Sequence, residues 1–314
     1  MSIPANQLTQ GLAHTEEFTG ELAGHRFLIT SVRTGNTEIF CVDPYTGSAA
    51  NVTRNPASHQ RYPSWSPDGS RIAFTSDRNG AYNLYVMDTD GGNVQQLTYE
   101  AAPSVVYFPN WSGDGKRIVF GLAGCEPPLM CEIDANGGSK RILGAGRDPH
   151  ISPDGKQLAF TKYLSTGYAV FLMETDSGKV SQITSHENLM GAVTPTFSPD
   201  GKSILYSDSV SHALELFCVS VESGEIRQLT NLGGFSTCAA WSPDMQWISF
   251  RLTDEDFWNH ADRMQRAYAE RRPDKRPVWV MRADGSEPHP LEALRYQCGI
   301  DGSRAVWDPL GGTR

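Results

Sequence analysis

Short runs of alternating hydrophobic and polar residues recur along the chain, and turn residues separate them. The most regular block is an aromatic residue, then Ser-Pro-Asp-Gly, then a second apolar alternation. Copies of this block, some with a substitution, cover residues 65–74, 111–120, 152–160, 197–206 and 241–250. Because proline presets φ and glycine supplies a positive φ, each copy predicts a tight hairpin between two strands.

Two further strands complete each repeat. A third apolar run follows the hairpin, as in residues 84–88 and 216–219. A second turn, such as Asp90-Gly91-Gly92, then leads to a short fourth run such as residues 96–98. Four strands in a unit of about 40–46 residues are the pattern of a β-propeller blade.

The two ends of the sequence complement each other. Residues 26–29, 39–43 and 51–53 fit the second, third and fourth strands of a blade, but no first strand precedes them. Residues 304–309 fit a first strand that has no successors. The sequence therefore predicts an all-β, six-bladed propeller of four-stranded blades, in which the C-terminal strand completes the N-terminal blade. We expect one domain over residues 1–314, with residues 1–20 as an N-terminal extension.

One connection is longer than the others. Residues 253–273 predict a helical insertion in blade 6, because Thr253 fits an N-cap, Arg271 and Arg272 suit the C-terminal turn, and Pro273 ends the helix. Its apolar face is expected to pack on the rim of the propeller. The insertion would act as a lid over a pocket or, alternatively, widen a surface for protein binding.

The Trp-Ser-Pro-Asp-Gly blocks resemble the repeats of TolB and its relatives, a propeller family that includes oligogalacturonate-lyase-type enzymes. The resemblance covers roughly residues 25–309, and it identifies the type of repeat rather than an activity. It implies either a non-catalytic interaction role, as in TolB, or lyase chemistry in which a histidine-held divalent metal neutralises a uronate carboxylate. The His/Gln metal motif of the lyases has no residue-by-residue match here, so no metal site and no cofactor are expected.

Candidate site residues come from segments that meet on one face of a propeller. The expected ligand-binding residues are Arg61, Tyr62, Tyr107, Arg147, Arg251, Trp258, His260 and Arg304. The expected acid/base residues are His59 and His150, oriented by Asp148 or Asp301. Since guanidinium groups match carboxylates and phosphates, these residues predict a small anionic or carbohydrate-like ligand at the channel mouth, with a proton-abstracting lyase reaction as the reaction type if there is catalysis.

Two other interpretations remain open. The charges would pair with one another and line a solvated channel, or the whole protein would be a non-catalytic protein–protein interaction scaffold. A deep cavity with converging His and Arg side chains would favour ligand chemistry, whereas a flat, apolar or filled face would favour a protein partner.

The composition of the chain restricts the classes of partner that it is expected to bind. The formal net charge of −9 argues against nucleic acid and anionic membrane surfaces, which require clustered cations. No apolar run approaches the roughly 20 residues that span a bilayer, and Met1–Gly20 lacks the apolar core of a signal peptide, so a cytoplasmic protein is expected. The six cysteines form no C-x-x-C pair and are expected to be reduced and mostly buried.

Overall fold

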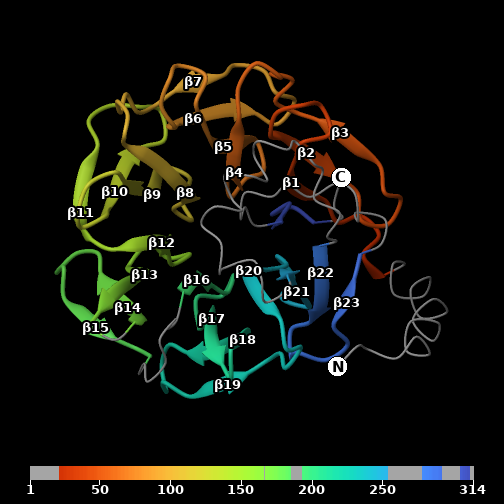
Figure 1. The fold of residues 1–314 in the computed structure, drawn as a ribbon, viewed down its shortest axis with the longest axis vertical. Helices are drawn as coiled ribbons and strands as arrows, with labels where there is room; N and C mark the ends of the chain where they lie inside the picture. Colours follow the sequence, from red (N-terminus) through yellow and green to blue (C-terminus); the bar gives the residue numbers. More distant parts are fainter. Residues whose placement is uncertain (1–20, 166, 185–192, 254–277, 292–304, 312–314) are drawn as a thin grey trace.

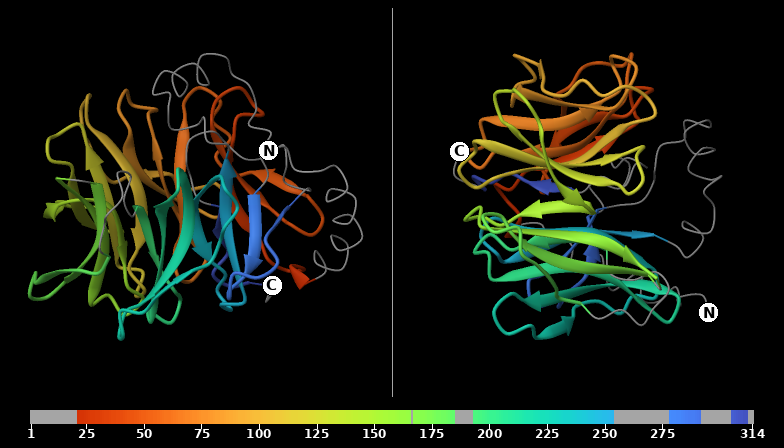
Figure 2. Two further views of the ribbon diagram at one scale, coloured as in Figure 1. Left: turned by 60° about the horizontal axis from the view of Figure 1, so that its bottom comes forward. Right: turned by 90° about the vertical axis from the view of Figure 1, so that its left-hand side faces the viewer.

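The computed structural model describes residues 21–165, 167–184, 193–253, 278–291 and 305–311, and all 24 of its elements are β-strands. The strands lie in sheets around a common centre (Figure 1). In the edge-on view of Figure 2 they run along the axis of this ring, so that their hairpin turns collect on its two faces. The expected all-β propeller architecture is confirmed. Of the helical insertion expected over residues 253–273, only Thr253 is described, and it ends a strand; the rest lies outside the described ranges, as does the extension over residues 1–20.

Four of the sheets have four antiparallel strands each. The first has the order Val306–Trp307 (β24), Phe27–Ser31 (β1), Glu38–Val42 (β2) and Ala49–Asn51 (β3). The second has the order Gln60–Trp65 (β4), Arg71–Ser76 (β5), Asn83–Asp88 (β6) and Gln95–Gln96 (β7). The third has Val105–Trp111 (β8), Arg117–Ala123 (β9), Leu129–Asp134 (β10) and Arg141–Ala145 (β11). The fourth has Arg147–Ile151 (β12), Gln157–Leu164 (β13), Gly167–Glu174 (β14) and Val180–Gln182 (β15).

The remaining strands form one eight-stranded sheet instead of two separate sheets. Its first half holds Val193–Phe197 (β16), Ser203–Val210 (β17), Ala213–Ser220 (β18) and Ile226–Gln228 (β19). Its second half holds Phe235–Trp241 (β20), Trp247–Thr253 (β21), Val278–Arg282 (β22) and His289–Pro290 (β23). A single parallel pair, Leu214 with Phe235, joins the halves.

The buried carboxylate of Glu215 accounts for this junction. Its Oε1 atom accepts hydrogen bonds from the backbone N–H groups of Leu232 and Gly233, both at 2.8 Å. The backbone N–H of Leu214 also donates to the carbonyl of Gly234 at 3.0 Å. The segment leading into β20 is thereby held along β18, which brings the two halves within pairing distance.

The two chain ends meet in the first sheet. β24 pairs antiparallel with β1, placing Phe27 opposite Trp307 and Leu28 opposite Val306. Next to this pairing, the Arg26 guanidinium forms an ion pair with Asp308, and the backbone N–H of Asp308 donates to the Arg26 carbonyl at 2.8 Å. Strands from opposite ends of the sequence therefore share one sheet.

The hydrophobic core lies between neighbouring sheets. One cluster combines Leu84 and Val86 of β6 with Val106 and Trp111 of β8, and all four side chains are buried. The Trp111 indole N–H also donates to the Ser64 carbonyl of β4 at 3.1 Å. Each sheet thus stabilises its neighbours by apolar contact, and some pairs of sheets add a hydrogen bond of this kind.

The strands nearest the axis share an irregularity. In β4, β8, β12, β16 and β20 the pairing with the second strand shifts register at the same place. A residue other than glycine adopts a positive φ there, between 46° and 55°, at Tyr62, Phe108, Asp148, Thr194 and Cys238. These bulges change the direction of the inner strands.

The Ser-Pro-Asp-Gly block closes the hairpins as the sequence predicts. In the first copy the Asp68 carboxylate accepts a hydrogen bond from the Ser66 hydroxyl at 2.6 Å and from the Ser70 backbone N–H at 3.1 Å. The copy at Ser112 has glycine in place of proline. A Cβ atom at Gly113 would lie 2.0 Å from the Pro153 carbonyl oxygen, so close approach of the neighbouring turn explains that departure.

The carboxylates in these turns should make the free energy of unfolding depend on pH. The Ser66 hydroxyl and the Ser70 N–H lower the pKa of Asp68 to about 2. A depressed folded-state pKa stabilises the fold above the unfolded value of about 4, and that stabilisation disappears as the pH falls towards about 2. We expect Asp68→Asn to lower the free energy of unfolding by less than about 1 kcal/mol at neutral pH, because water screens the exposed carboxylate, and to have less effect at pH about 2.5. Urea unfolding at both pH values measures this, and a difference independent of pH would contradict it.

The described cysteines Cys41, Cys125, Cys131, Cys218 and Cys238 are all free thiols, and Cys298 lies outside the described residues. Cys131 and Cys238 are buried, whereas the other three are half-buried, so the expectation of burial holds for two of the five. Burial raises the pKa of Cys131 to about 11, which keeps this thiol protonated at neutral pH. No helix within the described ranges is long and apolar enough to span a bilayer.

Candidate functional site

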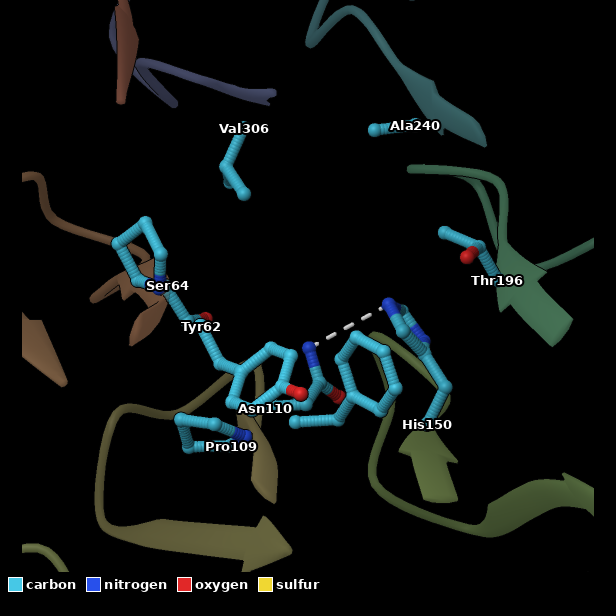
Figure 3. Close-up of a pocket in the computed structure, with 10 residues that line it drawn as sticks. Tyr62, Ser64, Pro109, Asn110, His150, Thr196, Ala240 and Val306 are labelled. Atoms are coloured by element: carbon cyan, nitrogen blue, oxygen red, sulfur yellow. Dashed lines mark hydrogen bonds between the residues drawn. The ribbon is translucent and has the colours of Figure 1, made fainter. Parts of the chain in front are cut away.

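A pocket on the ring axis takes one residue from the same register position of each inner strand. These residues are Ser64, Asn110, His150, Thr196, Ala240 and Val306, and Figure 3 shows them around the opening. Four of the six side chains are polar, and two are apolar. The rings of Tyr62 and Phe108 border the same pocket. Its volume of about 70 Å³ holds a few water molecules and is well below the roughly 300–1,000 Å³ of small-molecule sites.

His150 is held by donors at both ring nitrogens. The Phe197 backbone N–H points at Nδ1 at 3.3 Å, and the Asn110 side-chain amide nitrogen lies 3.3 Å from Nε2 (Figure 3). The orientation of the Asn110 amide is set by its oxygen, which accepts from the Ile151 backbone N–H at 2.9 Å. A neutral imidazole accepts at only one ring nitrogen, so the ring cannot accept both hydrogen bonds at once. The two contacts place the His150 ring between Asn110 of β8 and Phe197 of β16, where it links neighbouring sheets.

The other expected acid/base residues lie in different surroundings. His59 Nδ1 is 3.3 Å from the Thr37 backbone nitrogen, and the His59 backbone N–H donates to Asp77 at 2.7 Å. The Asp148 carboxylate accepts a hydrogen bond from the Thr161 hydroxyl at 3.3 Å. Thr37 joins His59 to the first sheet, whereas Asp148 contacts the second strand of its own sheet. Asp301 lies outside the described residues.

The arginines at the pocket mouth repeat one arrangement. Arg61 and Arg147 each occupy the last paired position before a bulge. The Arg61 guanidinium carbon lies 4.9 Å from the centre of the Tyr82 ring, and that of Arg147 lies 5.8 Å from the centre of the Tyr168 ring. Tyr82 directly precedes β6 and Tyr168 lies in β14, so each guanidinium lies near a tyrosine at the equivalent place in its repeat.

Arg251 departs from its equivalents in the other sheets. It pairs with Thr237 in the register where the second strands otherwise carry Thr75, Gly121, Thr161 and Ser207. Its side chain is buried, with 8% exposed. Three further expected ligand-binding residues, Trp258, His260 and Arg304, lie outside the described residues.

Two groups of aromatic rings lie between β4 and the β13–β14 hairpin. The Tyr62 and Phe108 rings are 4.6 Å apart and the Phe108 and Tyr107 rings 5.7 Å apart, whereas the Tyr168 and Tyr163 rings, 5.1 Å apart, form the second group. Burial raises the pKa of the Tyr107 hydroxyl, and the nearby Asp148, Arg147 and Tyr168 act on it electrostatically. We call these five residues the aromatic arc. Of them, Tyr62 and Tyr107 were expected from the sequence, whereas Phe108, Tyr163 and Tyr168 were not.

The arc is confined to one side of the mouth. At the two register positions that hold Arg61 and Tyr62 in β4, and Tyr107 and Phe108 in β8, the strand β16 carries Val193 and Thr194. In β20 the same positions carry Thr237 and Cys238. The fold therefore accepts small neutral side chains at these places, and the large rings and guanidiniums are not needed to build an inner strand.

Within the ranges that the structure describes, no three His, Cys, Asp or Glu side chains are grouped as they would be to hold a metal ion. Together, the narrow polar pocket and the aromatic arc, in which Tyr163 is exposed and the other four rings are half-buried, offer polar groups and apolar rings for binding.

Comparison with known proteins identifies relatives. A family model described as the TolB beta propeller domain matches residues 17–148 and 129–255. The Tol-Pal system protein TolB of Bordetella pertussis is 32% identical over 153 residues, which make up 48% of this chain and 34% of that protein. The matched segments span only 6% to 34% of the length of the curated relatives.

Solved structures share the architecture. TolB from Acinetobacter baumannii superimposes with a TM-score of 0.69 at 18% identity, over 98% of this chain and 74% of that chain. An oligogalacturonate lyase in complex with manganese gives a TM-score of 0.60 at 16% identity, over 92% of this chain and 78% of that chain. At these identities the likeness establishes the fold alone.

Proposed function

Because the chain belongs to the TolB β-propeller domain family, we propose that it is a non-catalytic propeller that binds a protein partner on the face bearing the aromatic arc. In this proposal the ring has six blades, and β24 completes the blade of β1–β3. The observation that carries it is the size of the axial pocket. At about 70 Å³ the pocket between the described residues is small for a sugar acid, whereas the surrounding face offers tyrosines and arginines, which are enriched in protein interfaces.

The surroundings of His150 support the same proposal. Its ring lies 3.3 Å from the Asn110 amide nitrogen of β8 and 3.3 Å from the Phe197 backbone nitrogen of β16, which favours a structural role between neighbouring sheets. The Tol-Pal system to which the named relatives belong is consistent with a protein partner.

Site-specific photo-crosslinking tests the proposal. A benzophenone amino acid replaces Lys162, which is exposed at the end of β13 beside the arc, and in a matched variant it replaces the exposed Lys116 in the turn between β8 and β9, at the other end of the blades. In an extract of the native cells we expect one defined protein adduct at position 162 and none at position 116. The captured protein, purified, should bind the unmodified propeller in calorimetry. Equal labelling at both positions, or no binding by the purified protein, would refute the proposal.

A second candidate function rests on Arg251. A buried guanidinium at a position where the equivalent residues are small or hydroxylated favours an anionic ligand. If a sugar acid is the ligand, galacturonate should raise the melting temperature of the wild-type protein and leave that of Arg251→Met unchanged. Under the first proposal, neither protein responds to galacturonate.

A further inference from the structure

The repeated sheets provide an internal control for identifying binding residues. Positions that are equivalent in register experience the same backbone geometry, so a side chain that the fold requires should recur from sheet to sheet. At the last paired position before the bulge the residues are Arg61, Tyr107, Arg147, Val193 and Thr237. The large side chains occupy three consecutive sheets and are absent from the next two, which marks β4, β8 and β12 as the functional side of the mouth.

The β12 end of the arc has the geometry of a recognition site. The Arg147 guanidinium lies against the Tyr168 ring, and this ring meets the edge of Tyr163 at an interplanar angle of 67°. Tyr163 is 62% exposed although it is a large aromatic residue. Arg147 is half-buried, its guanidinium carbon lies 5.8 Å from the centre of the Tyr168 ring, and it forms no ion pair with the side chains that the structure describes. The aromatic ring does not neutralise its charge.

The charges around Arg147 favour a partner segment that carries negative charge. The exposed Lys162 follows Thr161, the strand partner of Arg147, and adds a second cation to this part of β13. The one carboxylate next to Arg147 in the chain, Asp148, accepts a hydrogen bond from the Thr161 hydroxyl at 3.3 Å. A partner carboxylate can therefore meet the donors of Arg147, and an apolar ring beside it can pack on Tyr163.

We infer that the aromatic arc and Arg147 bind an extended segment of a partner protein in which a large aromatic side chain is flanked by carboxylates. This inference rests on the proposed function and specifies which half of the mouth carries the contact and what chemistry it recognises. Nucleic acid would also offer anions and stacking rings, but the chain has a formal net charge of −9, and binding a phosphate backbone needs many clustered cations.

Synthetic peptides test the inference directly. Three fluorescent peptides share one length and differ in their centre: Asp-Ala-Phe-Ala-Asp, Lys-Ala-Phe-Ala-Lys and Asp-Ala-Ala-Ala-Asp. By fluorescence anisotropy we expect the first to bind at least tenfold more tightly than either of the others. Arg147→Ala and Tyr163→Ala should each weaken its binding about tenfold or more, since each removes a charge-assisted hydrogen bond or the stacking surface.

The controls are Arg227→Ala and Tyr99→Ala. Arg227 is exposed on β19, where its guanidinium donates to the Asp284 carbonyl, and Tyr99 is 80% exposed beyond β7. Neither belongs to the arc, so both should bind the first peptide like the wild type. Equal binding of the three peptides, unchanged affinity in both arc variants, no binding at millimolar concentration, or tighter binding of a thymidine decamer would each overturn the inference. The photo-crosslinking test above does not depend on peptide chemistry, so an adduct at position 162 alongside any of these results would leave the proposed function standing.

Discussion

Trp307→Ala is expected to lower the free energy of unfolding by about 3–5 kcal/mol, the usual cost of removing a buried tryptophan side chain. The indole is 4% exposed, and its ring centre lies 4.2 Å from that of Phe27. Its N–H donates to the Ala240 carbonyl at 3.2 Å, so one side chain joins β24 to both β1 and β20. Chemical denaturation followed by circular dichroism measures the loss.

The conservative variant Trp307→Phe separates packing from hydrogen bonding. It keeps an aromatic ring against Phe27 but leaves the Ala240 carbonyl without its donor, so we expect a smaller cost of about 1–2 kcal/mol. If both variants unfold at the wild-type denaturant concentration, the pairing of β24 with β1 does not stabilise the protein, and the closed ring in our proposal is wrong.

Glu215→Leu should cost about 3 kcal/mol or more. The carboxylate is 1% exposed and accepts three hydrogen bonds, from the backbone N–H groups of Leu232 and Gly233 at 2.8 Å and from the Thr230 hydroxyl at 2.5 Å. Leucine fills the space but leaves three donors unsatisfied, each at a cost of about 1–3 kcal/mol. Thermal and urea unfolding measure the change in stability.

Glu215→Gln is the matched control, because its amide oxygen can still accept from the two backbone N–H groups. We expect it to lose at most half as much stability as the leucine variant. Amide hydrogen exchange adds a local measurement: protection of the Leu214 and Gly234 region should fall in the leucine variant before protection of β8 does. Equal destabilisation by both substitutions would show that burial, and not acceptance of these bonds, determines the role of Glu215.

Much of the strand order could be predicted from the sequence because the turn chemistry is local. The block at Ser66 contains its own hydrogen-bond donors and acceptor, so a short stretch of chain is enough to define the hairpin. The eight-stranded sheet could not be predicted in this way. It depends on Glu215 reaching a segment that begins at Leu232, and nothing in the sequence around either residue indicates that contact.

The candidate site was harder to predict from the sequence, because it too depends on contacts between residues far apart in the chain. Arg61 and Arg147 were expected to hold an anion at the axis, and this stays a prediction; what the sequence did not indicate is that each guanidinium lies near an aromatic ring, Tyr82 just before β6 and Tyr168 in β14. His150 was expected to be an acid or base, and its character depends on Asn110 and Phe197, which lie in two different sheets. The position of Tyr168 could have been inferred from the repeats. When the repeats are aligned, Tyr168 and Tyr82 are equivalent, and each follows an arginine, Arg147 or Arg61, at the same register position.

The pairing of β24 with β1 has a consequence for synthesis of the chain on the ribosome. β1, β2 and β3 are translated before all other described strands, and their inner neighbour Val306–Trp307 is translated after them. Until then the edge of β1 has no partner strand, and the apolar side chains of Phe27 and Ile29, both buried in the folded protein, remain uncovered. Each of the other four-stranded sheets can assemble as it emerges, because its strands are consecutive. The sheet of β1–β3 is therefore exposed to chaperones and to aggregation for longer than these sheets, until β24 has been translated and reaches it.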